Sequence, residues 1–292
     1  MLTPPSTPEF LPNYFVNARF IASDMDGTLT RNGCFSSQML TALESLADAQ
    51  WPVMIVTGRS AGWVHGVANM MPIVGAIAEN GGVFCFSEQS AIHRNTSEVH
   101  IIANGSNGAN ASNISSVSNP ANISDISDIP LHRQKLADTF RQIQNQYPQI
   151  EEAADNQFRL TDWTFDVRGL SQADLDAIAQ FCQDQGWSFT YSTVQCHIKP
   201  QGQDKATAIK SVLAQFFPDY TPDQVVTVGD SPNDVSLFNP ADFQCSVGVA
   251  NIVKYRDRLQ YFPAHITQAY EADGFCELTH ALLNRHIQGD QL

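Results

Sequence analysis

The sequence predicts an α/β protein in which a parallel, helix-covered sheet is interrupted by a smaller α+β domain. Short apolar runs alternate with helical patterns in the first third of the chain, and the same alternation resumes near residue 199. Between these regions, residues 164–167 alternate apolar and polar side chains, which is typical of a strand with one wet face. A chain of 292 residues is also long enough for about two domains.

The core elements are predicted from apolar runs and helix caps. Runs at 20–22, 52–56 and 73–78 each stop at polar or glycine residues, as buried strands do. Ser36 or Ser37 can cap a helix over 38–49, and a second helical stretch ends near residue 71. After the insertion we expect a helix over 204–217, a strand over 225–228, a short helix near 233–238 and an apolar run over 243–249.

The middle of the chain has its own pattern of elements. We expect a helix over 132–147, strands at 158–160 and 164–167, a helix over 172–185 and a strand over 188–191. The α/β core is therefore assigned to residues 19–83 and 199–292, and the inserted α+β domain to residues 84–198.

Two segments have the composition of chain without a packed core. Residues 1–18 contain three prolines among the first eight positions and are expected to form a flexible arm. Residues 103–128 include 6 Asn and 7 Ser among 26 residues, too little apolar area to offset the entropy of ordering. This stretch is expected to be a disordered insertion within the inserted domain.

Composition excludes several classes of partner. Lys and Arg total 16 against 30 Asp and Glu, and the net charge of −14 repels nucleic-acid backbones and anionic membrane surfaces. The chain has no apolar stretch near the roughly 20 residues that a membrane helix needs. Its 6 cysteines contain no CxxC pair and are typical of reduced thiols, so we expect a cytoplasmic protein, with the oligomeric state left open.

Polar motifs follow the predicted core strands or begin a core helix. They are Asp24 and Asp26 in DMDGTLT, Thr57-Gly58-Arg59, Lys205, and Asp230, Asn233 and Asp234 in GDSPND. Alone, each has a structural explanation: a DxD is usually a turn, and a lysine near a helix start is usually solvated. Parallel strands place their carboxyl ends along one edge of the sheet, where ligands bind, so the four motifs together predict a site.

The residue types predict the chemistry of that site. Clustered carboxylates raise one another's pKa unless a cation neutralises them, and Mg²⁺ prefers carboxylate and carbonyl oxygens. A lysine ammonium, a hydroxyl and loop amides complete a receptor for a phosphoryl group. One carboxylate can act as the nucleophile and form an aspartyl-phosphate, although the spacing does not say which.

The motifs DMDGTLT, VTGR, Lys205 and GDSPND resemble those of the haloacid dehalogenase (HAD) superfamily, specifically its Mg²⁺-dependent phosphatases. This resemblance implies a Rossmann-like core, and an insertion between the second and third motifs is similar to a type-IIB cap domain. The sequence AENGG at 78–82, together with GDSPND, is similar to mannosyl-3-phosphoglycerate phosphatases and sucrose-phosphate phosphatases.

The resemblance also implies roles for the core residues. Asp24 would attack phosphorus and bind Mg²⁺, while Asp26 would act as acid and base and ligate the metal through its carbonyl. Asp230 would be the remaining direct metal ligand, with Asn233 and Asp234 supporting the metal shell or the phosphoryl oxygens. The phosphoryl group would be bound by Thr57 and Lys205, and Lys205 would also orient Asp24.

Further contacts to substrate are expected from strand ends and from the cap. Gly58, Arg59 and Asn80 lie at core strand ends and are candidates for substrate binding. Arg159, Arg168 and His197 are candidates for contacts to an anionic or polyhydroxylated leaving group. The alternative for these three is an exposed charge on a strand.

The leading hypothesis is a Mg²⁺-dependent phosphatase that hydrolyses a small phosphorylated sugar or sugar-acid. A phosphomutase shares the aspartyl-phosphate and returns the phosphoryl group to its substrate. A non-catalytic sugar-phosphate-binding protein on the same scaffold is the third possibility. In each case the partner is a small phosphorylated metabolite.

Overall fold

The computed structural model describes residues 15–87, 99–102, 128–192 and 195–289. Its main sheet has eight strands in the order β11-β10-β9-β1-β2-β3-β4-β5. Pairing is parallel from β11 to β3 and antiparallel for β3–β4 and β4–β5. The strands are β1 (Phe20–Ser23), β2 (Val53–Val56), β3 (Gly75–Ala78), β4 (Val83–Phe86), β5 (Val99–Ile101), β9 (Val225–Gly229), β10 (Cys245–Gly248) and β11 (His265–Ile266).

Helices cover both faces of this sheet. One face packs against α1 (Ser37–Asp48), α2 (Ala61–Ala68) and α6 (Glu271–Gly289), and the other against α5 (Lys205–Phe216) and the 3-10 helix η4 (Pro232–Phe238). In β1, Ile21 enters the first core, whereas Phe20 and Ala22 enter the second. A strand buried on both faces reads as a continuous apolar run, which is why the sequence predicted these central strands.

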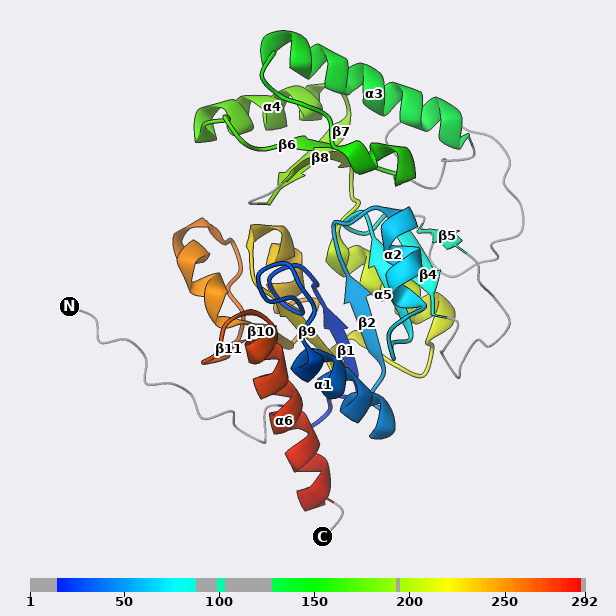
Figure 1. The fold of residues 1–292 in the computed structure, drawn as a ribbon, viewed down its shortest axis with the longest axis vertical. Coiled ribbons are helices and arrows are strands. Elements are labelled where there is room, and N and C mark those ends of the chain that lie inside the picture. Colours follow the sequence, from blue (N-terminus) through cyan, green and yellow to red (C-terminus); the bar gives the residue numbers. More distant parts are fainter. Residues whose placement is uncertain (1–14, 88–98, 103–127, 193–194, 290–292) are drawn as a thin grey trace, which may run out of the picture.

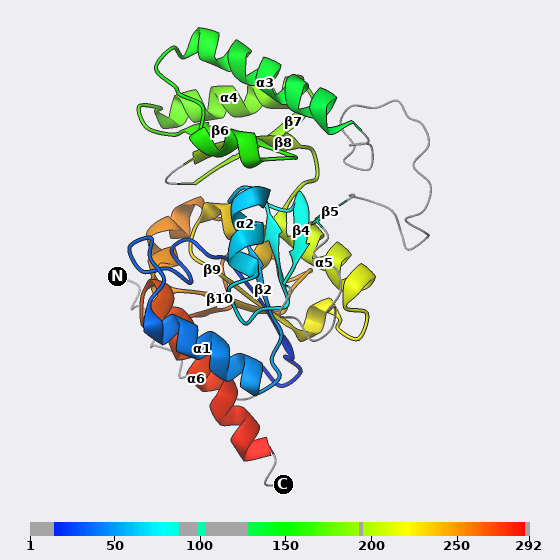
Figure 2. The same cartoon turned by 45° about the vertical axis from the view of Figure 1, so that its right-hand side comes forward.

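A second body lies over the carboxyl ends of the parallel strands (Figure 1). Its three-stranded antiparallel sheet has the order β6-β8-β7, with β6 (Trp163–Asp166), β7 (Trp187–Tyr191) and β8 (Gln195–Pro200). The helices α3 (Ile129–Gln146) and α4 (Gln172–Asp184) cover one face of it, and the other face is turned towards the main sheet (Figure 2). We call this body the cap.

Two predictions about the chain's organisation need correction. The boundary at residue 84 is wrong, because β4 pairs with β3, β5 pairs with β4, and both strands belong to the main sheet. Residues 80–82 form the turn of a buried hairpin that joins β3 to β4. The expected strand at 158–160 is absent from the described residues, where the 3-10 helix η2 (Ala154–Phe158) instead places the Asn156 side chain against Thr164 of β6.

The expected N-terminal arm and the expected Asn/Ser-rich insertion lie mostly outside the described residues. Phe15 and Ala18 are buried in the core, so the last residues of the expected arm are packed, while residues 1–14 lie outside the described part of the chain. Residues 103–127 of the expected insertion also lie outside it, and Asp128 caps α3. Among the helices that the structure describes, none combines the length and apolarity needed to cross a lipid bilayer.

Candidate active site

Three carboxylates meet at the carboxyl edge of the main sheet. Asp24 directly follows β1, and Asp230 directly follows β9. Since β1 and β9 are parallel neighbours with Ser23 opposite Val228, the two aspartates leave the sheet side by side. Asp234, from η4, completes a buried group whose carboxylate oxygens lie within 4.8 Å of one another.

Lys205 links two of these carboxylates. Asp204 caps α5 through the Thr207 backbone N–H, and this cap fixes the helix start at Lys205. The Lys205 Nζ then lies 2.6 Å from Asp24 Oδ1 and 2.6 Å from Asp234 Oδ1. Burial alone lowers the pKa of Lys205, but the two carboxylates outweigh it and raise that pKa, so the ammonium stays charged.

One ammonium does not balance three buried carboxylates. Burial and the neighbouring Asp234 raise the pKa of Asp24 well above its ordinary value, and the same two causes raise the pKa of Asp230 to about 7. Asp230 Oδ1 is buried with no hydrogen-bond partner among the described residues. A hard divalent cation supplies the missing charge and takes such oxygens as ligands, so the donor set fits Mg²⁺.

The backbone and a distant side chain hold Asp230 in place. Gly27 has φ +83°, and a Cβ there would lie 2.5 Å from Asp230 Oδ2, so the position requires glycine. Asn251 Nδ2 donates to Asp230 Oδ2 at 2.7 Å and to the Gly27 carbonyl at 3.0 Å. Asp234 Oδ2 accepts the backbone N–H groups of Asp230 and Ser231 at 2.9 and 3.2 Å. Asn251 was not found from the sequence, because no local motif marks it.

Asp26 lies beside this group and is paired with Arg59. The guanidinium Nε and Nη2 bind Asp26 Oδ2 and Oδ1 at 2.9 and 2.7 Å, and both side chains are partly exposed. This hydrogen-bonded pairing raises the pKa of Arg59. The Asp26 carboxylate is not part of the three-carboxylate group, and Arg59, expected to bind substrate, holds Asp26 here.

The loop after β2 brings together three predicted residues. Thr57 is buried, and its hydroxyl accepts the Arg59 backbone N–H. A Cβ on Gly58 would lie 3.0 Å from Asn80 Nδ2 and 3.3 Å from His197 Cε1 of the cap. The Asn80 side-chain amide is buried without a partner among the described residues. Core and cap side chains therefore converge on this loop, close to the expected phosphoryl-binding hydroxyl.

A buried glutamate fastens the cap to the core. Glu79, at the end of β3, accepts hydrogen bonds from the backbone N–H groups of Leu160, Thr161 and Asp162 of the cap and of Ala61 of the core. The Thr161 hydroxyl adds a further bond of 2.7 Å. The sequence analysis missed Glu79, which lies inside the AENGG segment.

Arg159 and His197 belong to this junction. Arg159 is fully buried, and its Nη1 bonds the Gly58 carbonyl at 3.0 Å and Asp162 Oδ1 at 2.9 Å. His197 Nδ1 lies 2.9 Å from Asp162 Oδ2, and burial lowers the pKa of this imidazole. Since Arg159 also pairs with Asp155, its charge is balanced within the protein, and it links the cap to the loop after β2.

Arg168 and Asn233 were also expected at the site. The Arg168 side chain is 88% exposed and pairs with Asp166 at the end of β6, so the structure shows the alternative, an exposed strand-end charge. In this structure Arg168 is therefore paired within the cap, and its contact to substrate stays a prediction. Asn233 lies on η4 and accepts a hydrogen bond from the Ser231 hydroxyl at 2.6 Å, next to the group without joining it.

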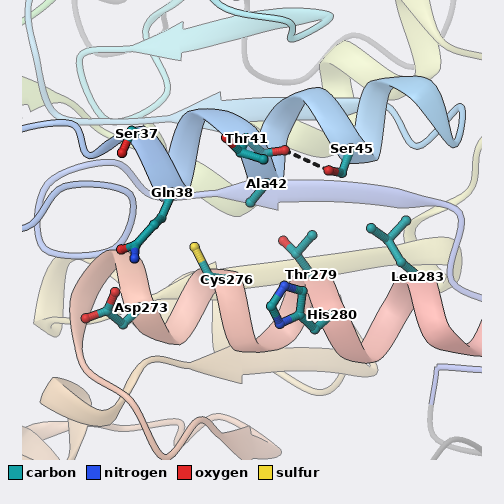
Figure 3. Close-up of a pocket in the computed structure, with 10 residues that line it drawn as sticks. All are labelled: Ser37, Gln38, Thr41, Ala42, Ser45, Asp273, Cys276, Thr279, His280 and Leu283. Carbon is teal, nitrogen blue, oxygen red and sulfur yellow. Dashed lines mark hydrogen bonds between the residues drawn. The ribbon is translucent and has the colours of Figure 1, made fainter.

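A separate pocket of about 410 Å³ lies between α1 and α6 (Figure 3). Its lining comes from the two helices and includes Thr41, Cys276 and His280. Its lining contains none of the residues that the sequence analysis proposed for catalysis, metal binding or substrate binding. The candidate chemistry therefore lies at the strand ends beneath the cap.

Comparisons with known proteins agree with this geometry. The haloacid dehalogenase-like hydrolase family matches residues 21–276. A phosphoglycolate phosphatase of Thermoplasma acidophilum is 22% identical over 239 residues, which cover 81% of this chain and 88% of that protein.

Two solved structures share the fold across core and cap. The sucrose-phosphatase of Synechocystis sp. PCC6803, solved with sucrose and phosphate, has a TM-score of 0.61 and 14% identity, covering 90% of this chain and 98% of that one. The HAD subclass IIB sugar phosphatase BT4131 has a TM-score of 0.59 and 13% identity, covering 93% and 99%. The resemblance to HAD phosphatases and the α/β fold class are thereby confirmed.

Proposed function

Since the chain belongs to the haloacid dehalogenase-like hydrolases, we propose that it is a Mg²⁺-dependent phosphatase acting on a small phosphorylated sugar or sugar-acid. The observation that carries the proposal is the Lys205 ammonium, held 2.6 Å from Asp24 and 2.6 Å from Asp234 beside Asp230. Phosphoryl transfer depends mainly on positioning and charge neutralisation, and this group offers both. The names of the phosphoglycolate phosphatase relative and of the sugar phosphatases that share the fold support a phosphate monoester as substrate.

Asp24 is the nucleophile in this proposal. Lys205 binds its Oδ1, which leaves Oδ2 to attack phosphorus. The new bond forms an aspartyl-phosphate while the bond from phosphorus to the leaving oxygen breaks. Asp24, Asp230 and the Asp26 carbonyl would hold Mg²⁺, and Asp234 would position both Lys205 and the Asp230 backbone. The bound ion supplies neutralisation of the phosphoryl oxygens.

Asp26 carries the proton in both steps. Its carboxyl group protonates the leaving alcohol, and the resulting carboxylate then takes a proton from the water that attacks the phosphorylated Asp24. Arg59 holds both Asp26 oxygens in this structure, so the pair separates before Asp26 reaches the leaving group. In this proposal the Thr57 hydroxyl and the loop amides at Gly58 bind phosphoryl oxygens.

The test is the release of inorganic phosphate from a panel of sugar phosphates and phosphorylated acids, with Mg²⁺ and with a chelator. We expect turnover that is lost on chelation and restored by Mg²⁺. Asp24→Asn should lose at least about a thousandfold in kcat, since an amide is no nucleophile. Asp48→Asn, at an exposed aspartate of α1, is the matched control.

Two results would contradict the proposal. If Asp24→Asn were as active as the control, Asp24 could not be the nucleophile. If turnover did not change on chelation, the reaction would not depend on a metal. Formation of an isomeric phosphate ester without free phosphate would instead identify a phosphomutase. Asp26→Asn should slow the breakdown of the phospho-enzyme, measured as trapped phosphate on the protein.

A further inference from the structure

The cap strand β8 presents two kinds of side chain to its two faces. Cys196 and Ile198 are buried in the cap core together with α3 and α4 residues. Successive side chains of a strand point to opposite faces, so Gln195, His197 and Lys199 share the face turned to the main sheet. His197 reaches the Gly58 loop on that face. Lys199, two residues further along, comes immediately before the connection to Lys205.

Lys199 is a buried cation without an internal partner. The residue is 7% exposed, and no hydrogen bond or ion pair joins its ammonium group to a described residue, but Nζ is not among the fully buried unpartnered atoms and so keeps some contact with solvent. An unpaired charge in such a place is costly, so proteins seldom keep one without a function. In a chain of net charge −14, with acidic groups on many surfaces, an unpaired buried lysine needs an explanation.

The carboxylates nearest to Lys199 are already engaged elsewhere. Asp162 is bound by Arg159 and His197. Asp204 is bound by the backbone and hydroxyl of Thr207, where it caps α5. Both raise the pKa of Lys199, but burial lowers it more and Lys205 adds to the lowering, with a net value of about 8. The ammonium is therefore still mainly protonated at neutral pH, with its hydrogen-bond donors unused.

We propose that Lys199 is a specificity-determining residue that binds a carboxylate on the leaving group of the substrate, so that the preferred substrates are small phosphorylated hydroxy acids. This rests on the proposed phosphatase function, because it assigns Lys205 and the three-carboxylate group to the phosphoryl end. The unpartnered Asn80 amide, which follows β3 and lies against Gly58, offers a neutral donor and acceptor on the same side of the main sheet. A neutral leaving group would leave the Lys199 charge unpaired.

The experiment compares substrates that differ only in the carboxylate. Phosphoglycolate is paired with hydroxyethyl phosphate, and phosphoglycerate with glycerol phosphate. For the wild-type protein we expect a higher kcat/KM for the acid of each pair. In Lys199→Met the preference should fall by about 30-fold, the factor that corresponds to the roughly 2 kcal/mol lost on truncating one partner of a buried charge pair.

Three controls separate specificity from a structural effect. The kcat/KM of Lys199→Met for the neutral esters should stay within about threefold of wild type. Lys199→Arg keeps a positive charge and should retain part of the preference. Lys135→Met makes the same chemical change at an exposed lysine of α3 and should alter neither substrate class.

Binding measurements keep this inference independent of turnover. Calorimetric binding of phosphoglycolate and hydroxyethyl phosphate to Asp24→Asn, with and without Lys199→Met, reports on the subsite alone. A Lys199-dependent preference for the acid in binding, without phosphate release by the wild type, would refute the phosphatase and retain the subsite. Equal loss for acid and neutral esters, or a wild type that does not prefer the acids, would overturn the role of Lys199.

Discussion

Replacing Glu79 by glutamine tests whether the cap is fastened to the core through this one carboxylate. In the native protein Oε1 accepts the N–H groups of Ala61 and Leu160, while Oε2 accepts those of Thr161 and Asp162. All of these groups are donors, so a carboxylate suits the position. Glutamine has the same shape but turns one acceptor oxygen into an NH₂ group.

The cost can be worked out from these contacts. With the glutamine oxygen at the Oε1 position, its NH₂ faces the N–H groups of Thr161 and Asp162, and neither retains an acceptor. Two orphaned buried donors cost about 2–6 kcal/mol together. Burial and the neighbouring Asp162 raise the pKa of Glu79, which shows that the ionised form is itself held at some cost. Removing that charge offsets part of the loss, and we expect a net destabilisation of about 2–4 kcal/mol.

Denaturant unfolding and hydrogen exchange measure the effect. Amide exchange at Thr161 and Asp162 should accelerate more than exchange within α5, because the loss is local to the junction. Glu44→Gln, at an exposed glutamate of α1, should leave both measurements unchanged. A Glu79→Gln protein within about 0.5 kcal/mol of wild type, the range of ordinary surface substitutions, would refute the assignment of Glu79 as the fastening group.

Two further predictions concern the metal and the pH dependence. Gly27→Ala places a Cβ 2.5 Å from Asp230 Oδ2 and should raise the Mg²⁺ concentration for half-maximal activity by about 10- to 100-fold. Gly33→Ala is the control, because Gly33 also has a positive φ of +75° but has open space around it, and it should leave that concentration unchanged. Equal shifts in the two variants would attribute the effect to backbone strain. Since the pKa of Lys199 is lowered to about 8, the ammonium is charged below that pH and neutral above it, so the ratio of kcat/KM for phosphoglycolate over hydroxyethyl phosphate should fall as the pH rises through about 8. Lys199→Arg should keep this ratio flat, and a wild-type ratio that is flat or rises would contradict the prediction.

The sequence predicted the central part of the fold because those strands are buried on both faces. The apolar runs at 20–22, 52–56 and 225–228 need no partner information to be recognised as strands. The pairing of β4 with β3 was missed because Asn80-Gly81-Gly82 is compatible both with a domain boundary and with a turn inside a sheet. That distinction depends on pairing with β3, which is not a property of the local sequence.

The candidate site likewise contains residues that a local sequence signal marks and residues whose role depends on contacts made in the fold. Asp24, Asp26, Asp230 and Lys205 were found because each stands at the end of a predicted strand or the start of a predicted helix. The adjacency of Asp24 and Asp230 comes from the pairing of β1 with β9, which are about 200 residues apart in the chain. Asn251 carries no local signal, since its role exists only through contacts with Gly27 and Asp230.

The cap strand β8 could have been found from its pattern. Residues 195–199 alternate polar and apolar side chains, and this alternation predicts one face towards a core and one away from it. The sequence analysis selected His197 but not Lys199, because it considered charges one at a time. What distinguishes Lys199 from Arg168 is burial without a partner, and burial depends on the packing of cap against core.

Satisfied and unsatisfied polar groups are separated within this junction. Glu79, Arg159 and Asp162 are buried with several partners each, and together they fix the cap turn against the Gly58 loop. Asp230 Oδ1 and the Asn80 amide are buried without a partner among the described residues, and the Lys199 ammonium, on a residue that is 7% exposed, forms no ion pair with them. A fold in which the supporting groups are saturated can hold a few unsatisfied ones in position, and bound ligand then supplies their missing partners. The first set of charges thus provides rigidity and the second provides binding. Exchanging a residue of the first set should therefore affect stability, whereas exchanging one of the second should affect the binding of metal or substrate.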